Sequence, residues 1–319
     1  MAERSDRQAE IFLRQAAYCD PRSALYGGLC RRLAIDPRVA ALAPDLRWDF
    51  PLRLLGGLHA LVLAGKASWD GVDDALDEHA AELAAFAATQ AVQTNEVQRA
   101  WVLLPGLLAT GAERVDLLEL GASAGLLLAL DDYDYRYRAG RWGRGEERLV
   151  LTGRDRRGPA RSLLARRLEV ERRRGIDLEP VALDDAGARL LEAFVWADQT
   201  DRIARLRRAI EVARRRAIPV ERGDYVERLP DLLAERRDDA LTVVFSSVTT
   251  MYLDDERYGE LRVALARAGG DGPLAWLSLE GPRDDTAYEG VALDLTLWPG
   301  GRTRRLARAD YHGTWLEWA

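Results

Sequence analysis

A short glycine-containing segment, LLELGASAGL at 117–126, holds the residue types that most directly suggest chemistry. Its apolar run predicts a buried strand that carries Glu119 near its end. We expect the chain to turn at Gly121 and to begin a helix between Ser123 and Gly125. Backbone N–H groups at the start of such a helix can face an anion. The segment therefore predicts a ligand site at the end of a strand.

Two familiar motifs resemble this turn, but one lacks required glycines and the other lacks its usual structural context. A dinucleotide loop needs G-x-G-x-x-G, but Ser123 and Leu126 occupy the second and third glycine positions. The same letters spell G-x-S-x-G, the nucleophile elbow of serine hydrolases, with Ser123 as nucleophile and Asp294 and His312 following in the order Ser–Asp–His. That elbow normally follows several strands, whereas the preceding 110 residues have helical periodicity. The hydrolase is therefore kept only as an alternative.

A third pattern, an acid followed by a glycine-rich turn, is typical of Rossmann-like S-adenosylmethionine-dependent methyltransferases, and the following strand ends favour it. Asp177 ends a second predicted strand, where a carboxylate can accept ribose hydroxyls, and Asp224 ends a third, where it can accept the adenine amino group. Ser246 and Ser247 end a fourth, and all lie where an open α/β sheet binds ligands. The predicted cofactor is S-adenosylmethionine, with S-adenosylhomocysteine as product, and its predicted binding residues are Glu119, Gly121, Ser123, Gly125, Asp177, Asp224 and Ser247.

Each acid also has a purely structural interpretation. Asp177 could be a turn residue, and Asp224 could cap a helix over 225–235. In dinucleotide-type folds the ribose acid follows the glycine turn by about 20 residues, whereas Asp177 follows Gly125 by 52. The assignment therefore requires an insertion at about 131–170. If 147–152 were the second strand instead, the ribose acid would be Asp155 or would be missing.

Composition excludes several classes of protein. The chain has 319 residues, two Cys and three scattered His, so no Cys/His cluster suits a structural zinc, and no metal site is predicted. Lys66 is the sole lysine and belongs to no Walker motif. A net charge of −6 disfavours nucleic acid as a partner. No signal or membrane segment is evident, so we expect a cytoplasmic protein without a membrane partner. The expected partner is a small-molecule substrate, and the chain is a possible homodimer.

The periodicity of apolar residues changes at about residue 110. Before it the spacing is helical, notably at 51–64, 72–89 and 95–109. After it, short apolar runs alternate with helical stretches, at 114–120, 175–181, 217–221, 241–248 and 273–280. This predicts an all-helical N-terminal domain over 1–110, forming a cap or lid, and an α/β domain over 111–319. The latter is expected to be a Rossmann-like, mostly parallel methyltransferase sheet.

The remaining segments add three expectations. Residues 290–298 and 305–318, joined by Trp-Pro-Gly-Gly, predict an antiparallel hairpin that closes the sheet edge. Within the insertion, 133–138 and 147–152 predict a small hairpin. The stretch 154–174, with nine Arg, is interpreted as a solvated helix face with a loop, or alternatively as a contact for an anionic substrate.

Several strings also resemble a known family. They are LELGASAGL (118–126), VQTNEV (92–97), FVWADQTDRIARL (194–206), RGD (222–224), LTLWPGG (295–301) and YHG (311–313). They resemble an uncharacterised bacterial family, classified as a domain of unknown function, whose fold is regarded as methyltransferase-like. The resemblance implies the fold and a cofactor site but no reaction. Leu127, Ala197 and Ser246 stand where the family pattern usually has Asn, Pro and His, and that His would have been a natural base.

The leading functional hypothesis is a methyltransferase that acts on a small molecule. The fourth strand ends in FSSV rather than a D/N-P-P-Y/F string, which argues against methylation of nucleic-acid bases. The candidate catalytic residues are Ser246, His312 and Glu96. The candidate substrate residues are Asn95, in the string VQTNEV, and Asp198 and Gln199, in the string FVWADQTDRIARL. Helix capping is an alternative explanation for the polar residues of both strings. A non-catalytic relative that binds a metabolite or a protein is the other alternative.

Overall fold

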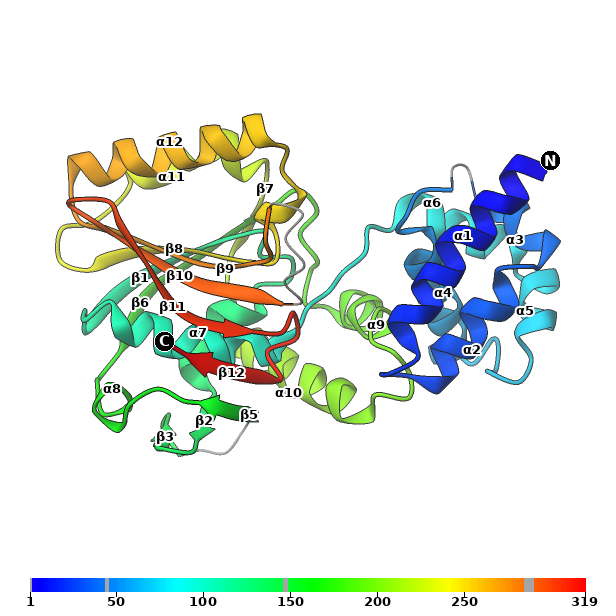
Figure 1. Ribbon diagram of the computed structural model, residues 1–319, viewed down its shortest axis with the longest axis horizontal. Coiled ribbons are helices and arrows are strands. Elements are labelled where there is room, and N and C mark those ends of the chain that lie inside the picture. The colour runs from blue at the N-terminus through cyan, green and yellow to red at the C-terminus, as the bar shows by residue number, and fades with distance from the viewer. Residues whose placement is uncertain (1, 44–45, 146–148, 284–289) are drawn as a thin grey trace. The chain divides into compact units, whose positions relative to one another are not determined.

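The structure, a computed structural model, describes residues 2–43, 46–145, 149–283 and 290–319 (Figure 1). It is a mixed α/β protein, about 47% helical, with a helical N-terminal region and a large, mostly parallel sheet. The chain folds as two units, 1–94 with 182–207, and 95–181 with 208–319. The expected boundary at residue 110 therefore falls inside the second unit, and a later segment joins the first. Each unit is described by itself.

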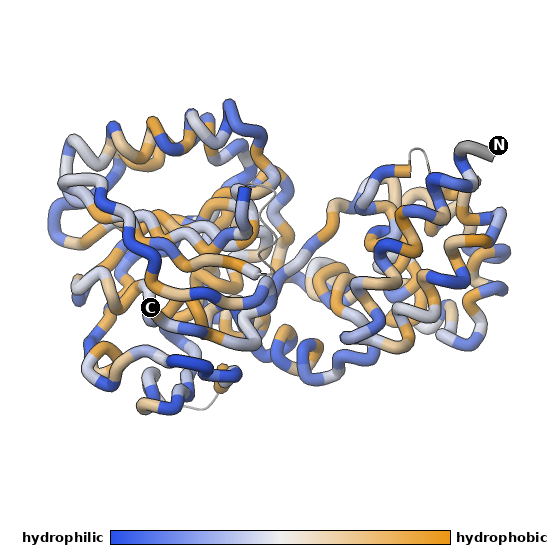
Figure 2. The backbone as a smooth tube through the Cα atoms, in the orientation of Figure 1, coloured by the Kyte–Doolittle hydropathy of each residue, from blue (hydrophilic) through white to orange (hydrophobic). Residues whose placement is uncertain are grey.

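The first unit is built from amphipathic helices that bury one face each. They are α1 (Ala2–Cys19), α2 (Ala24–Leu33), α3 (Pro37–Leu42), α4 (Phe50–Leu63), α5 (Val72–Glu78), α6 (Ala80–Thr89), α9 (Asp185–Ala193) and the first part of α10 (Thr200–Arg216). Figure 2 shows hydrophobic and hydrophilic segments alternating along these helices. Phe12, Tyr26, Phe50 and Leu54 are almost fully buried in their common core. The predicted helix over 72–89 is divided at His79, whose backbone leaves the helical conformation.

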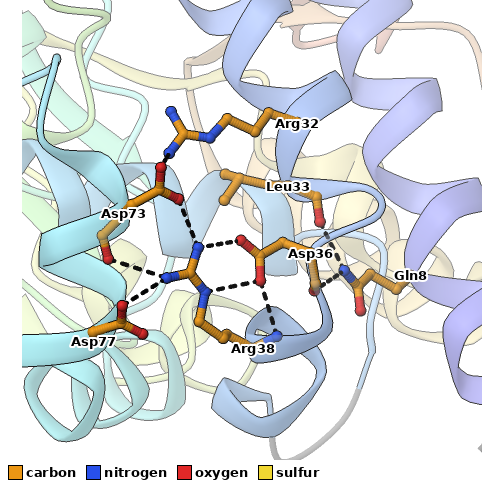
Figure 3. A network of polar contacts seen from close by, with 7 residues as sticks. All are labelled: Gln8, Arg32, Leu33, Asp36, Arg38, Asp73 and Asp77. Atoms are coloured by element: carbon orange, nitrogen blue, oxygen red, sulfur yellow. Dashed lines mark hydrogen bonds and ion pairs between the residues drawn. The ribbon is translucent and has the colours of Figure 1, made fainter.

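A network of charged side chains joins α3 to α5 (Figure 3). The Asp36 carboxylate caps α3 by accepting from the Arg38 backbone N–H (2.9 Å), and it also accepts two hydrogen bonds from the Arg38 guanidinium (3.0 and 2.7 Å). That guanidinium reaches Asp73 and Asp77 on α5. The Gln8 side chain donates to the Asp36 carbonyl oxygen (2.9 Å), which ties α1 to the same point. One residue thus serves as helix cap, ion-pair member and tertiary contact.

Asp36→Ala is expected to lower the free energy of unfolding by about 1–2 kcal/mol at pH 7, the usual cost of losing an N-cap. The hydrogen bond from Arg38 lowers the pKa of Asp36 below its usual 3.8. A lowered pKa gives stability that is present above the usual value and lost as the pH falls. Urea unfolding at pH 7 and at pH 3 should therefore show a difference that shrinks in acid. The exposed Asp70→Ala serves as control, and an equal difference at both pH values would contradict the assignment.

The second unit contains a nine-stranded sheet in the order β5-β12-β11-β10-β9-β8-β1-β6-β7. Its parallel part consists of β1 (Arg114–Leu120), β6 (Glu169–Asp177), β7 (Val220–Arg222), β8 (Leu241–Ser247) and β9 (Leu274–Glu280). After β1 the chain adds β6 and β7 on one side, and then β8 and β9 on the other. The strand order therefore reverses between β1 and β8, which is where open α/β sheets bind their ligands.

Apolar helices cover both faces of this parallel part. On one face, α11 (Tyr225–Ala234) and α12 (Asp255–Asp271) pack over Leu118, Leu120 and Val244. On the other face lies α7 (Ala100–Ala109), which is buried along nearly all its length and contacts β9 and β10. A Cβ on Gly106 of α7 would lie 2.7 Å from Leu277 on β9, so this glycine allows the close approach of helix to sheet. Both faces of the central strands are buried, as their continuous apolar runs predict.

The C-terminal strands differ in part from the prediction. β10 (Val291–Trp298) and β11 (Arg302–Ala309) form the expected antiparallel hairpin. The predicted second arm, 305–318, is interrupted by a turn in which the Asp310 carboxylate accepts from the backbone N–H (2.6 Å) and hydroxyl (2.7 Å) of Thr314. The chain then forms β12 (Trp315–Trp318), and β5 (Arg154–Arg157) pairs beyond it. The hairpin therefore lies inside the sheet and does not close its edge.

The predicted insertion lies between β1 and β6, but its local structure differs from the expectation. It contains η2 (Leu126–Asp132), β2 (Asp134–Tyr137), β3 (Gly140–Trp142), β4 (Val150–Thr152), β5 and α8 (Arg161–Leu164). The pairing of 133–138 with 147–152 as a hairpin is wrong, because β2 pairs antiparallel with β3 and runs parallel to β4. Residues 147 and 148 of that prediction lie outside the described residues. Tyr137 stacks on Trp101 of α7 (centroids 5.1 Å apart), which anchors the small sheet.

The arginine-dense stretch 154–174 is not a helix face with a loop. It forms β5, α8 and most of β6, which begins at Glu169, six residues before the predicted strand. β6 is paired on both sides, so its backbone hydrogen bonds outweigh the weak strand preference of its arginines. Arg173 forms a largely buried ion pair with Asp131, while Arg174 binds Glu221 (2.7 Å). These two arginines are held by acids of the same unit.

In the part of the chain that the structure describes, no helix is long and apolar enough to span a bilayer.

Candidate functional site

The glycine turn after β1 has the strained geometry that its sequence predicts. Gly121 and Gly125 both have φ of 70°, and Ser123 has φ of 49°. A Cβ on Gly121 would lie 2.2 Å from the Thr249 Oγ1 atom, so both space and conformation require glycine there. The Asp177 carboxylate at the end of β6 accepts from the Ser123 N–H (2.8 Å). The loop is thus held against the carboxyl end of the neighbouring strand.

β6 is the next strand of the parallel part after β1 and pairs directly with it, so the acid at the end of this second strand is Asp177. Asp155 lies instead in β5 at the far edge of the sheet, where it accepts from the Arg138 backbone N–H (2.9 Å). The insertion therefore accounts for the long spacing between the glycine turn and Asp177. The two oxygens of Asp177 each accept one backbone N–H, from Ser123 and from Glu179 (2.8 Å).

The helix expected at Ser123–Gly125 is not formed. The chain continues as η2, a 3-10 helix of seven residues over Leu126–Asp132. Its Leu126 and Leu130 carbonyl oxygens accept from the hydroxyls of Tyr133 and Tyr135, both at 2.6 Å. These bonds satisfy the carbonyl groups that a longer α-helix would use. The anion site that was predicted at the start of an α-helix would therefore lie at the start of a 3-10 helix instead.

Glu119 is the most unusual group at this end of the sheet. It is 3% exposed, and within the described residues its Oε2 atom has no hydrogen-bond partner. Burial raises the pKa of Glu119 well above its usual range, the negative charge of Asp177 raises it further, and Arg99 opposes the shift. The Ser247 hydroxyl, at the end of the adjacent β8, is also buried and also without a described hydrogen-bond partner. Unsatisfied buried polar groups are rare and often mark ligand sites.

One short segment crosses the ends of β1 and β8. The Asn95 side chain donates to the Ser123 hydroxyl (2.9 Å) in the glycine turn. Four residues later, at the end of η1 (Val97–Arg99), Arg99 donates to the carbonyl oxygens of Ser247 (3.2 Å) and Tyr311 (2.8 Å). The segment 95–99 therefore spans the point where the strand order reverses. The predicted residues Asn95 and Glu96 belong to the second unit.

Glu96 and His312 lie together in this region. One Glu96 oxygen accepts from the Gln98 N–H (3.1 Å), and the other lies 3.4 Å from the His312 Nδ1 atom. The Glu96 side chain is 3% exposed, whereas the His312 side chain keeps 22% of its surface exposed. Gly313 has φ of 68°, and a Cβ there would lie 2.7 Å from the Gln98 carbonyl oxygen. The glycine therefore lets the turn that carries His312 approach Glu96.

Asp224 has the capping role that was its structural alternative. Its carboxylate accepts from the Val226 backbone N–H (2.8 Å) at the start of α11, and it is paired with Arg257 of α12. Both oxygens are engaged. The position at the carboxyl end of β7 is as predicted, but the carboxylate is already occupied by protein donors.

Asp198 and Gln199 lie in the first unit and bond within it. The Ser23 hydroxyl donates to both carboxylate oxygens of Asp198 (2.9 and 2.7 Å). The Gln199 side chain donates to the Arg22 carbonyl oxygen (3.4 Å). The structure thus gives both residues a structural role, and the other predicted site residues belong to the second unit.

The hydrolase order Ser123–Asp294–His312 does not assemble as a triad through Asp294. That carboxylate is bound to Arg305 across the β10–β11 hairpin. The carboxylate beside His312 is Glu96 instead. The sequence order alone could not show this, because Arg305 is Asp294's neighbour only through the register of two strands.

Sequence reasoning missed Arg99 and Glu280. Glu280 ends β9, is 8% exposed, and accepts from the Thr249 N–H (3.0 Å). Burial raises the pKa of its carboxyl, while the Thr249 backbone and the facing Ser246 hydroxyl partly oppose the shift. The preceding Val248 has φ of 54°, which is costly for a β-branched residue and is typical of functional turns. The sequence pattern that could have identified Glu280 as a site residue is its position as an acid at the end of an otherwise largely apolar strand.

Comparisons with known proteins place the whole chain in one family. No curated protein matches it. The model of a family described as an uncharacterised protein conserved in bacteria (DUF2332) matches residues 9–318. Since this match covers nearly the whole sequence, the chain belongs to that family.

Proposed function

We propose that the second unit binds S-adenosylmethionine at the carboxyl ends of β1, β6 and β8 and transfers its methyl group to a small molecule. The observation that carries the proposal is Glu119, a buried carboxylate next to the reversal of strand order, one oxygen of which has no hydrogen-bond partner among the residues that the structure describes. A buried charge is costly unless it is paired. The cofactor carries an ammonium and a sulfonium, so it would add positive charge beside a carboxylate that Arg99 compensates only in part.

The neighbouring residues suit other parts of the same cofactor. Each Asp177 oxygen uses one acceptor site for a backbone N–H and keeps another that a ribose hydroxyl could use. The next residue, Leu178, is 62% exposed and offers an apolar surface to a flat base. The buried Arg99 side chain, which bonds the Ser247 and Tyr311 carbonyl oxygens, adds positive charge at this end of the sheet. Asp224 does not fit the role of adenine acceptor while Arg257 holds it.

Methyl transfer from S-adenosylmethionine requires few catalytic side chains, because the cofactor itself supplies the electrophile. The nucleophile must approach the methyl carbon in line, so the site mainly positions two ligands and arranges charge. The chain's net charge of −6 and its FSSV strand end favour a small acceptor over nucleic acid. The Rossmann-like methyltransferase fold is part of this proposal, and the parallel order β7-β6-β1-β8-β9 supports it.

Calorimetric titration of the full chain with S-adenosylmethionine and S-adenosylhomocysteine tests the proposal. Both are expected to bind with dissociation constants below about 1 mM. Asp177→Asn should weaken binding about tenfold, because a hydrogen bond to a charged acceptor is replaced by one to a neutral amide. Asp231→Asn, an exposed change on α11, is the matched control and should leave affinity unchanged. No binding of either ligand at near-millimolar concentration would show that the proposal is wrong.

A further inference from the structure

Resting on the proposed function, we infer that Glu96 and His312 form a proton-accepting pair and that the methyl acceptor is therefore a hydroxyl compound. Glu96 lies in the middle of the segment 95–99, which contacts the glycine turn through Asn95 and the end of β8 through Arg99. The pair therefore lies beside the reversal of strand order, at the same end of the sheet as Glu119.

The geometry of the pair matches a carboxylate that orients a histidine base. Glu96 Oε2 lies 3.4 Å from His312 Nδ1, an ion-pair distance at which the two atoms face each other without a formed hydrogen bond, as is common for catalytic contacts in ligand-free sites. A neutral histidine facing a carboxylate through Nδ1 carries its proton on that nitrogen, which leaves the Nε2 lone pair as the acceptor. Glu96 is itself oriented by the Gln98 N–H, so it cannot turn away freely.

The turn that carries His312 is held from three sides. Arg99 binds the Tyr311 carbonyl oxygen, the Asp310 carboxylate caps Thr314, and Gly313 packs against the backbone of Gln98. A base must be positioned within hydrogen-bond reach of the proton it removes. The His312 side chain retains 22% exposure, so its ring is reachable although Glu96 is buried.

This pair is useful only for an acceptor that carries a proton. An uncharged amine or a thioether attacks through a free lone pair, and a thiol is partly ionised near neutral pH. A hydroxyl compound does need a base. Its O–H proton passes to His312 Nε2 while its oxygen forms a bond to the methyl carbon. The bond between that carbon and sulfur breaks, its electron pair stays on sulfur, and the sulfonium becomes a thioether. The buried Glu96 carboxylate stabilises the imidazolium until the proton leaves to solvent.

The first measurement needs no substrate. The chain has only three histidines, so ¹⁵N spectra can resolve His312 after comparison with His312→Gln. The expected result is a neutral His312 protonated mainly on Nδ1, and Glu96→Met should shift it toward protonation on Nε2. A wild-type His312 protonated mainly on Nε2 would overturn the inference. Glu317→Gln, an exposed change in β12, is the control and should leave the tautomer unchanged.

The second measurement separates a base from a structural anchor. Full-length protein with S-adenosylmethionine is offered phenol or 4-nitrophenol, which is largely ionised at pH 8, and S-adenosylhomocysteine release is followed. His312→Gln should reduce transfer to phenol about 100-fold or more and transfer to 4-nitrophenol much less. It should leave S-adenosylmethionine affinity unchanged, as should His79→Gln in the first unit.

Each other outcome identifies what failed. An equal loss for both phenols would show that His312 only anchors the turn. Binding of S-adenosylmethionine by the wild type without transfer to either phenol would overturn the assigned substrate class. Absence of S-adenosylmethionine binding by the wild type would overturn the proposed function itself, and would be seen by calorimetry before any transfer is measured.

Discussion

Glu119→Gln is expected to stabilise the ligand-free protein at pH 8 by about 1–3 kcal/mol, because the amide is still polar but cannot carry the buried negative charge of the carboxylate. Burial, followed by the charge of Asp177, raises the pKa of the wild-type carboxyl. A raised carboxyl pKa means that the folded state binds more protons than the unfolded state, so stability is lost as the pH rises above the usual value near 4.5. Glutamine has no such titration. Urea unfolding at pH 5 and pH 8 should show the gain growing with pH.

The same substitution is expected to weaken S-adenosylmethionine binding about 10- to 100-fold, since a charge-assisted contact is worth about 1.5–3 kcal/mol. Calorimetry on the same preparation measures this. Opposite effects on stability and binding are the signature of a group retained for a ligand. Glu169→Gln, an exposed change at the start of β6, should alter neither. If Glu119→Gln destabilised the protein at pH 8, the carboxylate would have a structural role instead.

Gly121→Ala is expected to lower the free energy of unfolding by about 2–5 kcal/mol. The left-handed conformation, with φ of 70°, costs a residue with a side chain about 1–2 kcal/mol. The new Cβ would also lie 2.2 Å from Thr249 Oγ1, and overpacking costs about 1–3 kcal/mol more. Adding Thr249→Ala should recover part of the second loss and none of the first. Urea denaturation measures all three proteins.

A second glycine provides the matched control. Gly259 lies inside α12, where an added Cβ would meet no atom within 4 Å. Gly259→Ala is therefore expected to raise the free energy of unfolding by about 0.5–1 kcal/mol, through helix propensity alone. Gly121→Ala also moves the loop that Asp177 holds, so cofactor binding should be lost with it. Retained affinity in a folded Gly121→Ala protein would exclude the turn from the site.

Local sequence patterns correctly predicted the elements whose side-chain polarity matches their burial in the structure. The apolar runs at 114–120, 241–248 and 273–280 are β1, β8 and β9 to within a residue, because strands buried on both faces need continuous apolar side chains. The positive φ of Gly121 and the capping role of Asp224 could also be predicted from the sequence, since both depend on a few neighbouring residues. The family strings agreed with the family that the whole chain matches.

Other predictions failed where pairing with another segment, distant or nearby, overrides local preference. β6 is a strand despite its arginines because β1 and β7 pair with it on both sides. η2 replaces an α-helix because Tyr133 and Tyr135, from the insertion, bond its carbonyl groups. β2 pairs with β3 rather than forming a hairpin with β4. The hydrogen bonds that decide β6 join segments far apart in the chain, whereas those of η2 and of the β2–β3 pair join nearby residues whose apolar pattern does not reveal them.

The sequence by itself determined the kinds of elements, the glycine turn after β1 and the acids at the strand ends, because spacing and conformational freedom are local properties. Only the tertiary structure decided which of those groups act together. It placed Arg99 and His312 beside the ends of β1 and β8, and it left one Glu119 oxygen without a hydrogen-bond partner among the described residues. It also paired Asp224 with Arg257 and Asp198 with Ser23. The physical reason is that burial and pairing of charge depend on contacts between residues far apart in the chain, and those contacts set the chemistry of the site.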